Sequence, residues 1–189
     1  MNDYLSSVIK QFEYYKLLGE KTMLQLGNEE LFWQFNQESN SIAIIVQHLS
    51  GNMVSRWTDI FNTDGEKDFR NREKEFEYLI YSREDLFVLW EKGWKVLFDT
   101  LNELKENDLG KIIYIRNQGH TVIEAINRQL AHYPYHIGQI VFVGKMIKNE
   151  KWESLSIPRG KSDIYNKEKF NQPKAKSHFT DEFLDKDEK

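Results

Sequence analysis

The chain has 189 residues with 14% aromatic and 30% charged side chains, which is typical of a single globular domain with a sizeable core. Its net charge is −4, and its 26 basic and 30 acidic residues are interspersed, unlike the clustered basic residues of nucleic-acid-binding proteins. The chain contains no Cys, which excludes disulfides, thiolate-bound zinc, iron–sulfur clusters and a cysteine nucleophile. Any metal site must therefore be built from carboxylates and the five His.

The N-terminal segment shows no targeting or membrane signal. Met1-Asn2-Asp3-Tyr4 contains no basic stretch followed by a long apolar one, and the longest apolar run, Ile42 to Val46, is far too short to cross a bilayer. The sequence therefore predicts a cytoplasmic protein that binds neither a membrane nor a nucleic acid.

Four stretches have the apolar spacing of amphipathic helices. They span residues 3 to about 26, 42 to 61, 82 to about 105, and 121 to about 148. Hydroxyl groups at Ser39 to Ser41, Ser82 and Thr121 stand where helix N-caps are expected. The second helix is apolar over much of its circumference and is expected to be central. In the third, Trp90 and Trp94 fall on one stripe that predicts core or dimer packing.

The segments between these helices differ in length. Residues 62–81 are polar and charged, with an Asp64-Gly65 turn, and predict an extended surface connection that crosses over one end of the molecule. Residues 111–116 and 120–122 read as two short extended pieces around a turn at 117–119. The fold class predicted is all-α, an antiparallel four-helix bundle over residues 1–170, followed by a polar, flexible tail at 171–189.

Three histidines form the candidate site. His132 and His136 are four residues apart and share a helix face, about 6 Å apart along the axis, so both can bind one ion. An isolated pair of this kind more often makes ordinary hydrogen bonds. His48 changes that balance, because an unsatisfied imidazole in the most apolar helix would be costly to bury. Together they predict a three-His site that leaves an open position on the metal, as catalytic sites require.

Polar neighbours lie one helical turn from these ligands and could orient the imidazoles or bind substrate. They are Asn52, Arg128, Gln129 and Gln139. Taken singly, each is about as well explained as a solvated polar residue. Pro134 predicts a kink or a local break between His132 and His136.

The remaining candidates are weaker. His120 is expected in a loop and His178 in the tail, so neither is assigned to the site. Tyr133 stands where an HExxH zinc protease carries its glutamate, which disfavours metalloprotease chemistry.

Segments around these histidines resemble a known family. The stretches Ile44 to Leu49 and Asn127 to Ile140 are similar to those of the DinB/YfiT-like metal-binding four-helix bundles. A small bacterial branch of that superfamily also carries segments like Gly51 to Asp59, Thr63 to Lys67 and Ser156 to Ser162. The resemblance covers about residues 1 to 170.

The resemblance implies a divalent metal, zinc or nickel in many members, bound by His48, His132 and His136, commonly in a homodimer. Some superfamily members are thiol S-transferases that use bacillithiol, mycothiol or glutathione, and others resemble metal-dependent isomerases or hydrolases. Pro134 departs from the usual pattern, in which a residue compatible with an unbroken helix stands at that position.

Three functions follow as alternatives. In the first, a metal-dependent transferase activates the thiol of a small-molecule substrate, and Arg56 or Arg128 could hold a carboxylate of that thiol. In the second, the metal activates water for hydrolysis, although Glu124 and Asp59 are poorly spaced to act as the base. In the third, the protein is a noncatalytic metal sensor, stress-response module or structural dimer.

Overall fold

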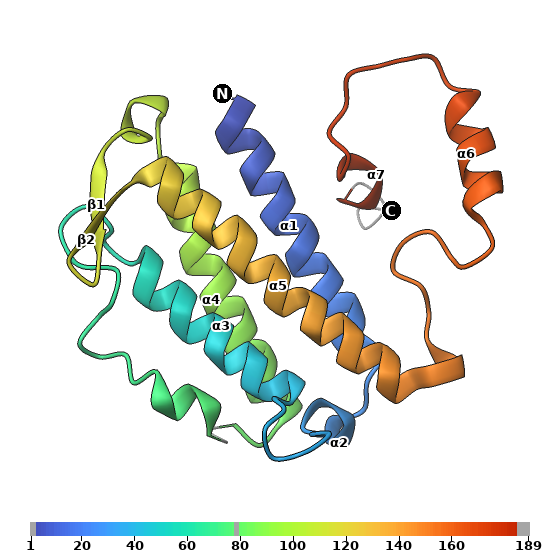
Figure 1. Ribbon diagram of the computed structural model, residues 1–189, viewed down its shortest axis with the longest axis horizontal. Helices are drawn as coiled ribbons and strands as arrows, with labels where there is room; N and C mark the ends of the chain where they lie inside the picture. Colours follow the sequence, from blue (N-terminus) through green and yellow to red (C-terminus); the bar gives the residue numbers. More distant parts are fainter. Residues whose placement is uncertain (1–2, 78–79, 185–189) are drawn as a thin grey trace.

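Helices make up most of the computed structural model, which describes residues 3–77 and 80–184 (Figure 1). The long helices of this described part are α1 (Asp3–Leu24), α3 (Ile42–Trp57), α4 (Arg83–Glu103) and α5 (Val122–Lys148). Its short elements are α2 (Asn28–Leu31), η1 (Glu73–Phe76), η2 (Glu106–Asp108), β1 (Ile112–Ile115), β2 (Gln118–Thr121), η3 (Asn149–Lys151), α6 (Ser162–Phe170) and α7 (Asp181–Leu184). The predicted helical bundle with a short extended insert before the last long helix is confirmed.

The starts of three long helices are fixed by side-chain caps. The hydroxyls of Ser41, Ser82 and Thr121 each accept a hydrogen bond from the amide three residues further on. The Glu124 carboxylate accepts in turn from the amide of Thr121 at 2.7 Å, which completes the predicted capping box. α3 ends at Trp57 rather than at residue 61, because the backbone leaves the helical conformation at the next residue.

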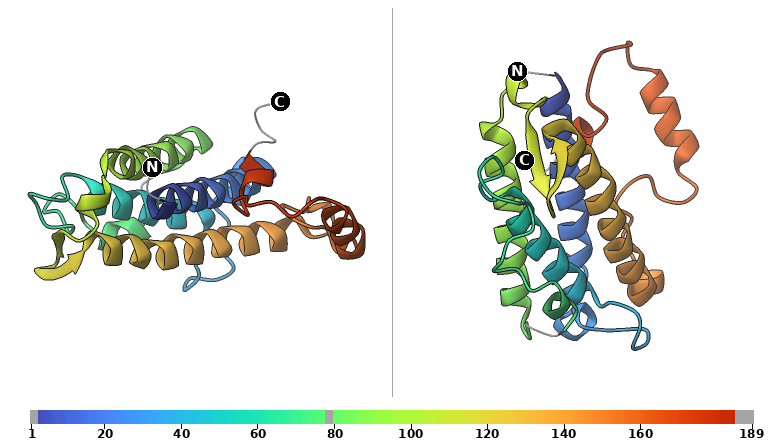
Figure 2. Two further views of the ribbon diagram at one scale, coloured as in Figure 1. Left: turned by 90° about the horizontal axis from the view of Figure 1, so that it is seen from above. Right: turned by 60° about the vertical axis from the view of Figure 1, so that its left-hand side comes forward.

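The long helices form two parallel pairs that run in opposite directions (Figures 1 and 2). α3 and α4 end together, where the Thr100 hydroxyl donates to the Trp57 carbonyl at 2.8 Å. α1 and α5 begin together, where the Tyr4 hydroxyl donates to Asn127 Oδ1 at 2.7 Å. Because α3 and α4 are parallel, the connection 58–82, described here apart from residues 78–79, returns along the length of the bundle, and its η1 segment contacts α3.

α3 is the most enclosed element. All of it is buried except Gly51 and Val54, which confirms its central position and means that any polar group on it needs a partner inside the protein. Trp90 and Trp94 of α4 are each 1% exposed, so their stripe is core and not a dimer surface.

The hairpin between α4 and α5 turns at a different place from the one predicted. The register of β1 and β2 leaves a two-residue loop, Arg116–Asn117, rather than a turn at 117–119. Both residues are left-handed, with φ of 54° and 59°, as a type I′ turn requires. The Asp64 carboxylate accepts both of their backbone amides at 2.8 Å, one on each oxygen. The connection 58–82 is thereby tied to the hairpin.

Beyond residue 161 the chain continues through α6 and α7. α7 lies against α1, where Lys10 pairs with Asp181 at 2.6 Å and Ser7 hydrogen-bonds His178 at 3.0 Å. A domain boundary at residue 170 stays a prediction. Within the described residues, no helix combines the length and the apolar character needed to cross a membrane.

Candidate metal centre

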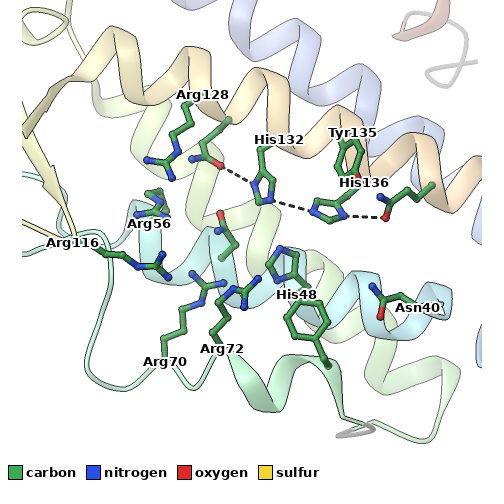
Figure 3. Close-up of a pocket in the computed structure, with 14 residues that line it drawn as sticks. Asn40, His48, Arg56, Arg70, Arg72, Arg116, Arg128, His132, Tyr135 and His136 are labelled. Atoms are coloured by element: carbon green, nitrogen blue, oxygen red, sulfur yellow. Dashed lines mark hydrogen bonds between the residues drawn. The ribbon is translucent and has the colours of Figure 1, made fainter. Parts of the chain in front are cut away.

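The three predicted histidines come together at the seam between α3 and α5 (Figure 3). One nitrogen each of His48, His132 and His136 lies within 4.8 Å of the other two. The Nε2 atoms of His132 and His136 are 3.1 Å apart. Helix α5 runs through Pro134 without interruption, so the predicted local break is wrong. A proline removes only its own amide and disturbs one carbonyl, and the hydrogen bonds above and below keep the two rings on one face.

Each imidazole is oriented by a hydrogen bond at Nδ1. The pairs are His48 with Glu75 Oε2 at 2.9 Å, His132 with Gln129 Oε1 at 3.2 Å, and His136 with Gln139 Oε1 at 3.2 Å. Carboxylate and amide oxygens only accept, so Nδ1 carries a proton in all three rings and Nε2 is the nitrogen that remains for a metal. Fixing the tautomer through the remote nitrogen is how metal-ligating histidines are usually prepared.

His132 and His136 approach each other closely while both rings are uncharged. Burial, followed by the charges of His136, His48 and nearby arginines, lowers the pKa of His132 to about 3. Burial and His48 lower the pKa of His136 to about 4. Both rings are therefore neutral near pH 7, and two lone pairs face each other at 3.1 Å with no proton between them.

A cation satisfies such an arrangement. Nitrogens bound to one tetrahedral zinc at 2.0–2.1 Å would lie about 3.4 Å apart, which is close to the His132–His136 separation. The three-His cluster could therefore hold a metal ion.

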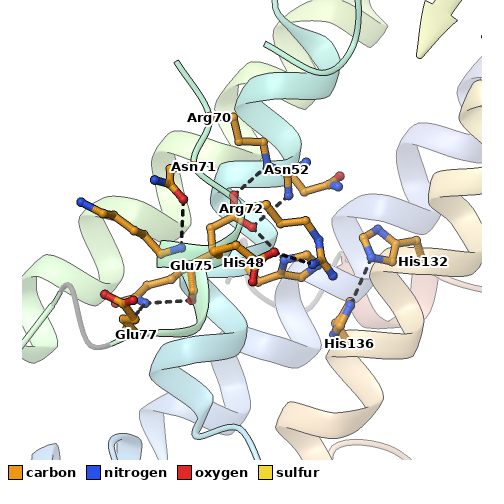
Figure 4. Close-up of polar contacts among 12 residues, drawn as sticks. His48, Asn52, Arg70, Asn71, Arg72, Glu75, Glu77, His132 and His136 are labelled. Carbon is orange, nitrogen blue, oxygen red and sulfur yellow. Dashed lines mark hydrogen bonds and ion pairs between the residues drawn. The ribbon is translucent and has the colours of Figure 1, made fainter. Parts of the chain in front are cut away.

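The residue that positions His48 comes from the connection 58–82 (Figure 4). Glu75, in η1, is 6% exposed and accepts from Nε and Nη2 of Arg70 at 2.7 and 2.9 Å. Burial alone would raise the pKa of Glu75, but the hydrogen bonds from Arg70 and His48 lower it, so the carboxylate stays charged. The Phe76 ring stacks on His48 with centroids 5.2 Å apart.

The sequence did not predict this contribution. Residues 62–81 were expected to be a surface connection, and this is wrong for Arg70, whose side chain is 3% exposed, and for Glu75. The one signal in the sequence was the presence of aromatic residues within a charged run. Nothing in the spacing links Glu75 to His48, 27 positions earlier.

A cavity of about 450 Å³ opens beside the histidines. Its lining includes the predicted residues Asn52, Arg56, Gln129, Arg128 and Gln139. It also includes arginines that were not predicted, namely Arg70, Arg72 and Arg116. No acidic residue of the described chain lines it.

The other sequence candidates lie elsewhere or act indirectly. Tyr133 is fully buried, accepts from Trp57 Nε1 at 2.9 Å and donates to Asn52 Oδ1 at 3.1 Å, so it faces the core and fixes Asn52. His120 lies in β2 and not in a loop. His178 hydrogen-bonds Ser7 of α1 and is not part of the cluster.

Fold and site together define a helical bundle protein with a three-His cluster that can hold a metal ion at the edge of an arginine-lined cavity. The chain belongs to the family described as "Protein of unknown function (DUF1572)", which residues 1–161 match. Neither the curated proteins nor the solved structures contain a match to it. The bundle and the cluster are consistent with the DinB-like resemblance, although the matching family does not carry that name.

Proposed function

We propose that the protein is a DinB-like metal-dependent enzyme in which His48, His132 and His136 hold one divalent cation, zinc or nickel. The observation that carries this proposal is the preparation of the three rings, since each Nδ1 is engaged by an acceptor and each Nε2 is free to coordinate. Three neutral imidazoles leave the full double charge on the cation and at least one coordination position for a small molecule. A homodimer in the cytoplasm is part of this proposal.

The reaction that suits this site best is thiol S-transfer, with a low-molecular-weight thiol such as bacillithiol. A divalent cation held by the three histidines would lower the pKa of a thiol entering the cavity. The thiol loses its proton to solvent, its sulfur forms a bond to an electrophilic carbon, and the leaving group departs with its electron pair. Because the chain has no Cys, the sulfur nucleophile must come with the substrate.

Metal-assisted hydrolysis is less well supported, because it needs a base beside the attacking water. Glu124 is engaged in the capping box and Asp59 hydrogen-bonds Asn62, and neither lines the cavity. Glu75 is occupied by Arg70 and by the Nδ1 side of His48. The transferase needs no such base.

Metal content and thiol transfer test the proposal together. Purified protein equilibrated with zinc or nickel is expected to retain one ion per chain by elemental analysis, and His132→Ala is expected to lose it. The matched control is His178→Ala, a histidine outside the cluster, which should keep the ion. With bacillithiol and an alkyl halide, the loaded protein should consume the thiol faster than His132→Ala.

The contrary results are equally specific. Equal occupancy in His48→Ala and the unchanged protein would remove the three-His assignment. Retained metal with no thiol consumption above the His132→Ala rate would favour a noncatalytic protein, and product formation without any thiol would favour a hydrolase.

A further inference from the structure

Arg56 is a buried cation that forms no hydrogen bond or ion pair with its side chain in the described part of the chain. Arg56 is 5% exposed, and the Nε and Nη1 atoms of its guanidinium are buried without a hydrogen bond. It lies two helical turns after His48 on α3 and lines the same cavity. Its position is set by packing, since a Cβ at Gly65 would lie 3.0 Å from Nη1. Glu66 attracts Arg56 but is paired with Arg70 and Arg116, so an anion in the cavity would give this guanidinium a partner that the described residues do not supply.

A second arginine faces the same space from the opposite helix. Arg128 lies one turn before His132 on α5, lines the cavity, and forms no ion pair with a described residue. Figure 3 shows the Arg56 and Arg128 side chains directed into one region. Burial chiefly, and repulsion from Arg128 in addition, lowers the pKa of Arg56. Two like charges held side by side repel each other, and an anion placed between them would relieve that repulsion.

Two further arginines stand at the rim. Arg116 reaches the cavity from the hairpin turn, where Asp64 holds its backbone in the left-handed conformation. Its contact with Glu66 is 3.3 Å and its side chain is 61% exposed, so it keeps donors for a ligand. Arg72 lies over the Phe76 ring at 5.1 Å, and its ion pair among the described residues is a 3.5 Å contact with Glu73, which is 88% exposed.

The charge of the cavity is opposite to that of the chain. The protein is net −4, yet the cavity is lined by five arginines and by no acidic residue among those described. The carboxylates just behind the lining are already engaged, Glu75 by Arg70 and His48, and Glu66 by Arg70 and Arg116. The cavity therefore keeps an excess of positive charge. Four separate segments of the chain contribute its arginines, whereas arginines that were simply solvated on one helix face would not converge on a cavity.

We propose that the cavity binds an oxyanion, a carboxylate or phosphate group of the substrate, between Arg56 and Arg128 and next to the three-His cluster. The substrate is then held at two points, with its reacting group at the histidines and its anionic group at the arginines. The first point rests on the proposed function, whereas the arginine site does not depend on it. Planar guanidinium groups match both oxyanions through paired hydrogen bonds.

Titration of the chelator-treated protein with inorganic phosphate and with malonate tests the arginine site. Calorimetry at constant ionic strength, adjusted with sodium chloride, separates specific binding from general charge attraction. We expect Arg128→Gln and Arg56→Met each to weaken binding by about tenfold to a hundredfold, the effect of losing a charge-assisted hydrogen bond. The matched control is Arg159→Gln, which removes one exposed arginine outside the cavity and should leave binding unchanged.

Each result decides the proposal. Binding of either anion that depends on both arginines supports it, and the preferred anion identifies the substrate group as a phosphate or a carboxylate. No binding of either anion at millimolar concentration, or equal binding in Arg128→Gln and Arg159→Gln, would overturn it. Arg128 is exposed, so Arg128→Gln is expected to fold and can test the proposal even if Arg56→Met does not fold. Metal content is measured on the same samples. If the unchanged protein retains no metal but still needs both arginines for the anion, the metal proposal fails and the oxyanion site stands.

Discussion

Glu75 is the residue on which the orientation of His48 depends. It is buried, and its carboxylate accepts hydrogen bonds from Nδ1 of His48 at 2.9 Å and from the Arg70 guanidinium. A buried carboxylate of this kind is stable only because both neighbours donate to it. Its hydrogen bond to Nδ1 also fixes which His48 nitrogen remains for a metal.

Replacing Glu75 with Gln is expected to weaken metal binding by about tenfold to a hundredfold, because an amide keeps the shape but loses the charge that orients His48. The same change should lower the free energy of unfolding by about 2–3 kcal/mol, since the buried Arg70 loses its nearest counterion and keeps only Glu66 at 3.3 Å. Competition with a chromophoric chelator and urea unfolding measure the two effects. Glu73→Gln, in the same η1 turn but 88% exposed, is the control and should change neither.

At the scale of elements, the close approach of η1 to α3 depends on a small residue. Gly51 lies on α3 where the Glu75 side chain crosses it, and a Cβ added there would overlap the carboxylate. Glu75 cannot move aside freely, because Arg70 and His48 hold it from two directions. On α5, Gly138 has open space around its Cα.

The Gly→Ala substitutions at these two positions should therefore have different effects on stability. Gly138→Ala is expected to raise the free energy of unfolding by about 0.5–1 kcal/mol, which is the helix propensity gained. Gly51→Ala has the same intrinsic gain but displaces Glu75, so it should weaken metal binding and show no net stabilisation. Urea unfolding and a metal titration on both variants check this, and equal stabilisation by the two would refute the packing argument.

The helices of the site could be predicted from the sequence, whereas the path of the connection between α3 and α4 could not. The His132–His136 relation follows from helical spacing alone, and the burial of His48 follows from the apolar helix around it. Arg116 was expected in a strand, whereas Asp64 holds it in a left-handed turn by hydrogen bonds over 52 positions. Glu75 and Arg70 were missed for the same reason, because the path of a long connection is set by tertiary contacts that leave no local periodicity.

At the scale of the whole molecule, folding of the bundle buries two histidines and keeps them uncharged. His132 and His136 are partly buried where α3, α5 and the connection 58–82 meet, and the fold lowers the pKa of both to well below the value of 6.5 in an unfolded chain. Between pH 6.5 and about 4 the unfolded chain therefore binds protons that the folded protein does not.

The metal-free protein is accordingly expected to lose stability as the pH falls through this window. The loss should be about 2–4 kcal/mol, less than the full shifts imply because the rings are only partly shielded from solvent. Urea unfolding of chelator-treated protein at pH 7, 5.5 and 4.5 measures it. A double variant with Gln at positions 132 and 136 should show a flatter profile, and parallel profiles for the two proteins would contradict the assignment.

The two Asp64 hydrogen bonds also determine where this chain can tolerate changes in length. Loops of a helical bundle usually accept insertions, because they carry no packing. Here the connection 58–82 and the turn at Arg116–Asn117 are joined through Asp64 and form one wall of the cavity, so an extra residue in either would shift Arg116 or Arg72 relative to the histidines. The exposed stretch around Arg159 carries no such constraint, and it is the natural place in this fold for an inserted peptide or a fused domain.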